Sequence, residues 1–234
     1  MSDPLEALHG GLVVSVQAPD GSPVAGSSHI AALARAAELG GAAGIRAVEI
    51  AAVKEAVGLP VIGLRKRRVE GSEVYITPEL SDARAVAAAG ADIVAVDATL
   101  RPRPDGVDLT SLVSELPVPV LADVDTLEAG VAAWEAGAAA VATTLAGYTG
   151  GAAASAASPP GGPSAEPDLE LVSALATELD CPVFAEGRIA TPGHVREAFE
   201  AGAFAVVVGT AITDPVALTR GFAAAARGST HAAR

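Results

Sequence analysis

Small and hydrophobic residues recur along the chain in two alternating short phrases. In the first phrase, Ala-Gly-Ala precedes an apolar run, with copies that begin at Ala89, Ala136 and Ala201 and a looser copy at 41–45. A glycine just past a helix can adopt the left-handed conformation that ends it, and a β-branched run is typical of a strand buried on both faces. We therefore predict that each copy ends a helix and begins a strand.

The second phrase places a proline before an apolar run, at Pro60, Pro119 and Pro182. Proline is tolerated at the first position of a strand. Between the phrases, apolar residues at helical spacing, as in 109–116 and 195–202, predict amphipathic helices. Three residue pairs predict an N-cap followed by proline in the first helical turn, namely Thr77-Pro78, Thr191-Pro192 and Asp214-Pro215.

With 11–17 as the first strand, about eight strands alternate with helices, which is the pattern of a single (β/α)8 TIM barrel of the α/β class. The competing fold is a doubly wound open sheet. The 234 residues suit one domain over 1–234, with the barrel at about 11–226. The segment 150–167, rich in Gly, Ala, Ser and Pro, is predicted to be a flexible loop because the repeats continue on both sides.

Charge and composition limit the partners. The net charge of −13 repels nucleic acid and anionic membrane surfaces. The single cysteine, Cys181, excludes an intrachain disulfide, and neither a signal sequence nor a long apolar run is visible, so we expect a cytoplasmic protein. The four histidines form no visible metal cluster, and we predict neither a metal nor another cofactor. An anionic ligand must therefore be held by a local group of donors.

Polar residues end the predicted strands, where barrel enzymes carry their reactive groups. Asp123 and Glu186 each lie four residues after an entrance proline, and Lys66 lies six residues after another. Strand side chains alternate with a period of two, so these three residues are predicted to point into the barrel lumen. Arg65 and Arg67 should then point toward the helix layer or solvent.

Each of these residues also has a purely structural interpretation. Lys66 lies in the basic run 65–68, which is typical of a solvated edge. Asp123 could begin the turn into the next helix, and Arg46, at another strand end, could pair with a neighbouring carboxylate. Several ionisable groups at successive strand ends nevertheless cost desolvation unless they are paired or used, which favours a functional site.

The last two strand ends suggest a phosphate site. Glycine at Gly187 and Gly209 lets the backbone approach an anion closely, and the following residues, Arg188 and Thr210, begin short predicted turns whose N–H groups can bind phosphate. Tyr148 follows the sixth strand, where it could contact the substrate or simply be packed.

The strand-end segments together resemble the N-acylglucosamine-6-phosphate 2-epimerase family, also called the N-acetylmannosamine-6-phosphate 2-epimerases. The similarity runs in order from about Gly11 to Phe222 and rests on the segments 14–17, 44–47, 61–66, 96–99, 122–126, 143–149, 185–189 and 208–213. It implies an isomerase that interconverts N-acetylmannosamine 6-phosphate and N-acetylglucosamine 6-phosphate by removing and returning the C2 proton. It also implies a role in sialic acid breakdown and no redox cofactor.

The resemblance also implies roles for individual residues. Lys66 matches the catalytic acid/base, and Glu186 matches a glutamate that assists it. The positions that hold or orient the sugar are matched by Gln17, Arg46 and Asp123. A base and an enolate stabiliser are also what C2 deprotonation requires. Burial in the barrel mouth and nearby Arg46 would lower the pKa of a lysine base, whereas the two carboxylates would raise it, so we expect its environment to change when substrate closes the site.

One departure from the family pattern leaves alternatives open. Asp214 stands where family members commonly carry an arginine that could contact the phosphate. It could serve as a helix N-cap, or it could weaken phosphate binding or mark a different anionic group. Another phosphate-sugar epimerase or isomerase, or a non-catalytic sugar-phosphate-binding protein, are the alternative functions. Small residues on helix faces, at Ala87, Ala88 and Ala133, would permit a homodimer.

Overall fold

The computed structural model describes residues 3–18, 21–149 and 166–229, in which eight parallel strands close into a barrel in chain order. The strands are β1 (Leu12–Val16), β2 (Gly44–Ala47), β3 (Val61–Gly63), β4 (Ile93–Asp97), β5 (Val120–Asp123), β6 (Ala140–Ala142), β7 (Val183–Glu186) and β8 (Ala205–Val208). The predicted (β/α)8 barrel is confirmed. The predicted flexible loop at 150–167 lies outside the described residues except for its last two positions.

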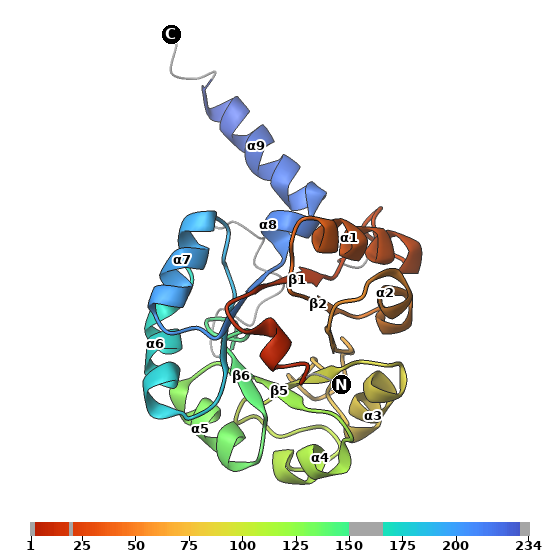
Figure 1. Cartoon of the computed structure of the whole chain (residues 1–234), viewed down its shortest axis with the longest axis vertical. Helices are drawn as coiled ribbons and strands as arrows, with labels where there is room; N and C mark the ends of the chain where they lie inside the picture. The colour runs from red at the N-terminus through yellow and green to blue at the C-terminus, as the bar shows by residue number, and fades with distance from the viewer. Residues whose placement is uncertain (1–2, 19–20, 150–165, 230–234) are drawn as a thin grey trace.

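Most of the helices surround the barrel as an outer ring (Figure 1). In chain order, the helices of the described residues are η1 (Glu6–Leu8), α1 (Ser27–Leu39), α2 (Ile50–Ala56), α3 (Leu80–Ala88), α4 (Leu109–Glu115), α5 (Leu127–Glu135), α6 (Leu169–Glu178), α7 (Pro192–Glu200), α8 (Thr210–Thr213) and α9 (Pro215–Ser229). The glycines of the Ala-Gly-Ala phrases end their helices in the left-handed region, with φ of 96° at Gly90, 91° at Gly137 and 100° at Gly202. The phrase therefore does what the sequence predicts.

Two of the three predicted N-caps are confirmed. The side chain of Thr191 accepts the His194 N–H at the start of α7, and the Asp214 carboxylate accepts the Ala217 N–H at 2.9 Å at the start of α9. The prediction for Thr77 is wrong, because α3 begins three residues later and Thr77 is held by other contacts.

The lumen is filled by apolar side chains of one strand parity. Alternate residues of the strands form this core with residues from the chain segments beside them; it contains Val13, Ile62, Leu64, Ile76, Ile93, Ala95, Leu121, Ala140, Ala142, Leu145, Phe184, Ala205 and Val207. At the N-terminal end of the barrel, Leu5 and Leu8 complete the same cluster, so that η1 lies across the middle of the ring (Figure 1). The lumen is therefore closed at that end, and polar chemistry is confined to the other.

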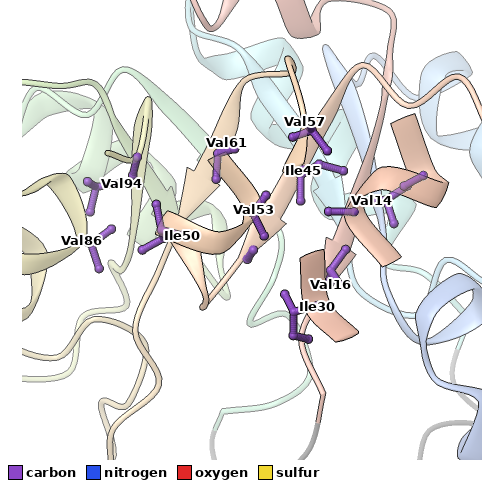
Figure 2. Close-up of a cluster of buried hydrophobic side chains, with 14 of the residues drawn as sticks. Val14, Val16, Ile30, Ile45, Ile50, Val53, Val57, Val61, Val86 and Val94 are labelled. Carbon is purple, nitrogen blue, oxygen red and sulfur yellow. The ribbon is translucent and has the colours of Figure 1, made fainter. Parts of the chain in front are cut away.

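Residues of the opposite strand parity pack outward against the helices. Figure 2 shows Val14, Ile45 and Val61 facing Ile30 and Val53 of the surrounding helices. Gly63, at the end of β3, lies where neighbouring elements approach most closely: a Cβ there would stand 2.7 Å from the Cβ of Ala91 and 2.8 Å from a methyl carbon of Val86. Glycine is thus required for β3 to sit against the helix layer.

Helix α9 projects away from the barrel (Figure 1). Its apolar side chains at Val216, Leu218 and Phe222 are exposed, and Phe222 retains 78% of its accessible surface. Large exposed apolar side chains that gather on one element are typical of an interaction surface.

We predict that Gly63→Ala lowers the free energy of unfolding by about 1–3 kcal/mol, because the added methyl group overpacks a filled core. Urea unfolding measures the change. Gly58→Ala is the matched control, since its Cβ would have a nearest neighbour 3.6 Å away, the Oε1 of Glu38. Equal unfolding midpoints for both variants would show that β3 does not need glycine at position 63.

Candidate active site

A buried ion pair crosses the mouth of the barrel. Arg46 at the end of β2 donates from Nη1 to Oδ1 of Asp123 at 3.0 Å and from Nη2 to Oδ2 at 2.6 Å. The two side chains are 1% and 0% exposed. Asp123 ends β5, so this bidentate pair joins two strands on different sides of the lumen. Arg46 is thus the partner of a carboxylate and, at the same time, a group at the predicted site.

Glu186 and Thr144 extend the pair toward β7. The Oε2 of Glu186 lies 3.1 Å from Nη1 of Arg46. The Thr144 hydroxyl lies 2.6 Å from Oδ1 of Asp123 and 3.1 Å from Oε2 of Glu186. A hydroxyl has one proton, so it can donate to only one of the two carboxyl groups at a time. Both contacts are hydrogen bonds when Thr144 donates to Asp123 and accepts from a protonated Glu186.

The charges in this cluster favour that arrangement. Burial raises the pKa of Glu186 above its ordinary value of 4.5, Arg46 opposes the rise, and Asp123 adds to it. Burial also disfavours the charge on Arg46, but the two carboxyl groups outweigh it and raise the pKa of the guanidinium. One positive charge therefore stands between two acids, and burial favours the protonated form of Glu186 by raising its pKa.

Lys66 lies beyond the end of β3, on the same parity as the lumen residues Ile62 and Leu64. Its charge lowers the pKa of Glu186, so both groups act on the same mouth. Its side chain is exposed, which corrects the expectation that protein atoms bury it. Lys66 lies three residues beyond Gly63, the last residue of β3, so it stands outside the regular part of the strand.

The flanking arginines point outward, as predicted. Arg67 binds Asp82 of α3 at 2.7 Å and Glu79 at 2.9 Å, and Arg65 lies 3.4 Å from Asp82. The alternation of side chains across the strand extension therefore continues through the basic run.

Gln17 directly follows β1 and offers an unsatisfied acceptor. Its Nε2 donates to the Ser15 hydroxyl at 2.7 Å, whereas its Oε1 is buried without a hydrogen-bond partner among the described residues. A buried acceptor of this kind costs free energy unless a ligand satisfies it. The geometry suits an amide N–H or a hydroxyl of a bound molecule.

Arg188 and Tyr148 meet beside the ends of β6 and β7. The guanidinium of Arg188 lies 5.5 Å from the centre of the Tyr148 ring, and its Nη1 donates to the Ala146 carbonyl at 2.7 Å. Its Nε donates to the Glu166 carbonyl at 2.8 Å. Tyr148 is 43% exposed, so it is not a core tyrosine, and a ligand can reach it.

The two predicted phosphate loops are neighbours because β7 and β8 pair, with Glu186 opposite Val207. Gly187 has a φ of 113°. Gly209 immediately precedes the short helix α8, which is tied to β1 by a hydrogen bond of 2.8 Å from the Thr213 hydroxyl to the Ser15 carbonyl. Thr210 is the first residue of α8, so its N–H precedes the intrahelical hydrogen bonds.

Two further residues at the mouth have no role in the sequence prediction. Tyr75 is half-buried against the lumen cluster, and burial, followed by Asp123 and Asp97, raises the pKa of its phenol. Asp97 at the end of β4 binds Arg101 at 2.9 Å, and burial raises the pKa of its carboxyl. Asp97 is visible in the sequence as a strand-end residue, whereas Tyr75 belongs to neither repeated phrase.

Within residues 3–18, 21–149 and 166–229, no group of three or more His, Cys, Asp or Glu side chains is arranged to hold a metal ion. In the same ranges, no helix combines the length and hydrophobicity needed to cross a membrane.

Glu186→Gln is predicted to change the pH dependence of stability. Above pH 4.5 and below the raised pKa, folded Glu186 keeps a proton that the unfolded chain releases, so wild-type stability falls as pH rises through this window. The variant lacks this contribution. The free energy of unfolding of the variant minus that of the wild type should therefore increase with pH and then level off. Urea unfolding of both proteins from about pH 4 to about pH 8 measures it, and a constant difference would contradict the raised pKa.

Comparison with known proteins identifies the family. A family model described as "Putative N-acetylmannosamine-6-phosphate epimerase" matches residues 30–228. Proteins named "Putative N-acetylmannosamine-6-phosphate 2-epimerase" are similar: one from Synechococcus elongatus is 49% identical over 89% of this chain and 90% of its own. One from Caldanaerobacter subterraneus is 43% identical over 94% and 92%. The solved N-acetylmannosamine-6-phosphate 2-epimerase from Clostridium perfringens superposes with a TM-score of 0.85 at 37% identity, covering 94% of each chain. The chain therefore belongs to the N-acetylmannosamine-6-phosphate epimerase family.

Proposed function

We propose that this protein is a 2-epimerase, an isomerase that interconverts N-acetylmannosamine 6-phosphate and N-acetylglucosamine 6-phosphate. The observation that carries the proposal is the placement of Lys66 and Glu186 at one barrel mouth, with Glu186 beside the buried charge of Arg46. The similar proteins from Synechococcus, Caldanaerobacter and Clostridium are named for this activity. As the family resemblance implies, the reaction serves sialic acid and amino-sugar breakdown.

The reaction needs only a proton to leave and return. In the open-chain sugar, the unprotonated Nζ of Lys66 removes the proton from C2, the C–H electron pair forms a C1=C2 double bond, and the π pair of the C1 carbonyl moves onto its oxygen as an enolate. The Lys66 ammonium then returns the proton to the opposite face of the planar C2, the carbonyl forms again, and the free amine is regenerated. No atom is gained or lost, and no electron acceptor is required.

The buried cluster supplies the stabilisation that the enolate needs. A protonated Glu186 can donate to the developing oxyanion, and Arg46 offers a fixed positive charge behind it. Asp123 holds Arg46 in place through two hydrogen bonds. Gln17 presents its unpartnered Oε1 to the sugar, where the N-acetyl N–H is a suitable donor.

Substrate binding must also cover Lys66, whose side chain is exposed. An exposed ammonium is well hydrated and is a poor base near neutral pH. We propose that the surroundings of Lys66 change when the substrate binds. The sugar, with Tyr148 beside it, would displace water from the lysine side chain.

For the phosphate, we propose the adjoining loops at Gly187, Arg188, Gly209 and Thr210. Gly187 and Gly209 permit close backbone approach, and the Arg188 guanidinium is fixed by two carbonyl groups beside this edge. The charged ligand cannot readily cross a bilayer, which suits the cytoplasmic location expected from the sequence.

The carboxylate of Asp214 is engaged as the N-cap of α9, which supports the capping interpretation of this position. A side chain that caps a helix satisfies a backbone donor and does not need a ligand to explain it. The non-catalytic alternative therefore gains no support from Asp214.

We further propose that the protein forms a homodimer through α9. Ala133, named in the sequence interpretation, is fully buried within the subunit and cannot lie in an interface. Leu218 and Phe222 are instead four residues apart on one exposed face of the projecting helix. A second copy of the chain is the partner that would cover this face.

Lys66→Ala should reduce exchange of the C2 proton with solvent deuterium by about 10²–10⁴-fold, because the base is lost. Proton NMR of N-acetylmannosamine 6-phosphate in deuterated water follows both exchange and epimerisation. Lys54→Ala is the matched control, because Lys54 forms an ion pair with Asp92, which precedes β4. This variant should exchange the C2 proton at the wild-type rate. Undiminished exchange in the Lys66 variant would remove it as the base.

Phe222→Asp should convert the dimer to a monomer, because a charge cannot be buried without a partner. Light scattering coupled to size-exclusion chromatography gives the mass. Ala224→Asp, an exposed substitution about 200° around the helix from Phe222, is the control that should remain dimeric. A monomeric wild type would refute the proposal.

A further inference from the structure

The segment that carries Lys66 is held outside the regular barrel. Strands β3 and β4 pair only through Ile62 with Ile93 and Gly63 with Val94. Beyond this point the chain at 74–77 returns and inserts between them. Lys66 forms an antiparallel bridge with Ile76, and the Asp97 N–H donates to the Ile76 carbonyl at 3.0 Å. The position of Lys66 therefore depends on the inserted segment 74–77, which replaces β4 as its neighbour.

Thr77 ties this insert to both sides. Its N–H donates to the Arg65 carbonyl at 2.6 Å, and its hydroxyl accepts the Arg65 N–H at 3.1 Å. The same hydroxyl donates to the Ala95 carbonyl of β4 at 2.6 Å. Thr77 is fully buried and has a φ of 46°, a conformation that a β-branched residue rarely adopts. Such a residue persists only where its surroundings hold it, and it is common near functional sites.

Arg103 helps to hold Thr77 in this conformation. Its Nη2 donates to the Thr77 carbonyl at 2.5 Å, and its Nη1 donates to the Asp97 carbonyl at 2.8 Å. One guanidinium thus binds the strained residue and the end of β4 together. Thr77 and Arg103 therefore act on the β3 and β4 side of the mouth, between the strands that carry Arg46 and Asp123.

We propose that Thr77 and Arg103 are positioning residues for the catalytic base: together they hold the 74–77 insert against the backbone on either side of Lys66 and so set where its amine stands. This inference rests on the proposed function, because it concerns the group that removes the C2 proton. The residues make no contact with the reacting atoms themselves; they act through Arg65 and Ile76, the neighbour and the bridge partner of Lys66.

The test compares Thr77→Val, which removes the hydroxyl at nearly constant shape, with Thr77→Ser, which keeps it. We expect Thr77→Val to lower kcat by about 10- to 100-fold, because a small displacement of a catalytic group is enough for such a loss. KM should change little, since the phosphate loops lie at the other edge. Thr77→Ser should restore most of kcat. Because Lys66 moves relative to Glu186, the pH profile of kcat/KM should also shift in the valine variant.

Arg103→Met gives a second, independent variant and should show the same loss of kcat. Arg84→Met is its matched control, because Arg84 of α3 makes an exposed ion pair with Glu115 away from the insert. Circular dichroism and thermal unfolding, neither of which depends on activity, establish that each variant is folded. The kcat values are then compared per folded molecule.

Wild-type kcat and an unchanged pH profile in both Thr77→Val and Arg103→Met would overturn the proposal. So would an equal loss in Thr77→Ser and Thr77→Val, since the hydroxyl would then be irrelevant. Failure of the proposed function is a separate result: it appears as undiminished C2 exchange in Lys66→Ala, whatever the Thr77 variants do.

Discussion

The buried guanidinium of Arg46 is the charge on which the mouth of this barrel depends. A fully desolvated positive charge is tolerated only when it is paired and hydrogen-bonded, and here Asp123 of β5 binds two nitrogens of the guanidinium while Glu186 of β7 lies 3.1 Å from one of them. Closure of the sheet is what brings β2 across the lumen from these strands. Arg46 can be buried because the closed barrel brings Asp123 and Glu186 within reach of its guanidinium. The two acids are in turn held at the mouth by their contacts with Arg46.

The residues of the site are held in place in two different ways. The acids and Arg46 stand on regular strand ends, where neighbours on both sides fix them. Lys66 stands on an extension supported by a strained threonine and an arginine from another loop. Rigid and precisely placed groups suit electrostatic stabilisation, whereas a base that must meet both faces of a planar carbon needs access. The exposed lysine beside a buried cluster is consistent with that division.

The repeated phrases of the sequence were sufficient to predict the barrel and the side of each strand end, because parity is a local property. Asp123, Glu186 and Arg67 point where this parity places them. The environment of Lys66 and the role of Thr77 were not predictable in the same way. Both depend on a segment that inserts between two strands, and its partners come from distant parts of the chain. Helix η1 was missed for a similar reason, since its two leucines carry no repeat.

Helix η1 also determines how molecules enter and leave. Leu5 and Leu8 close the far end of the lumen, so that, among the residues that the structure describes, the proposed active site opens at the other end. Substrate and product of the proposed reaction differ only in the configuration of one carbon and carry the same phosphate. Each must leave by the opening through which the other arrives, and each occupies the same anchoring groups. Turnover in either direction is therefore governed by competition between the two epimers, and net flux follows their relative concentrations in the cell.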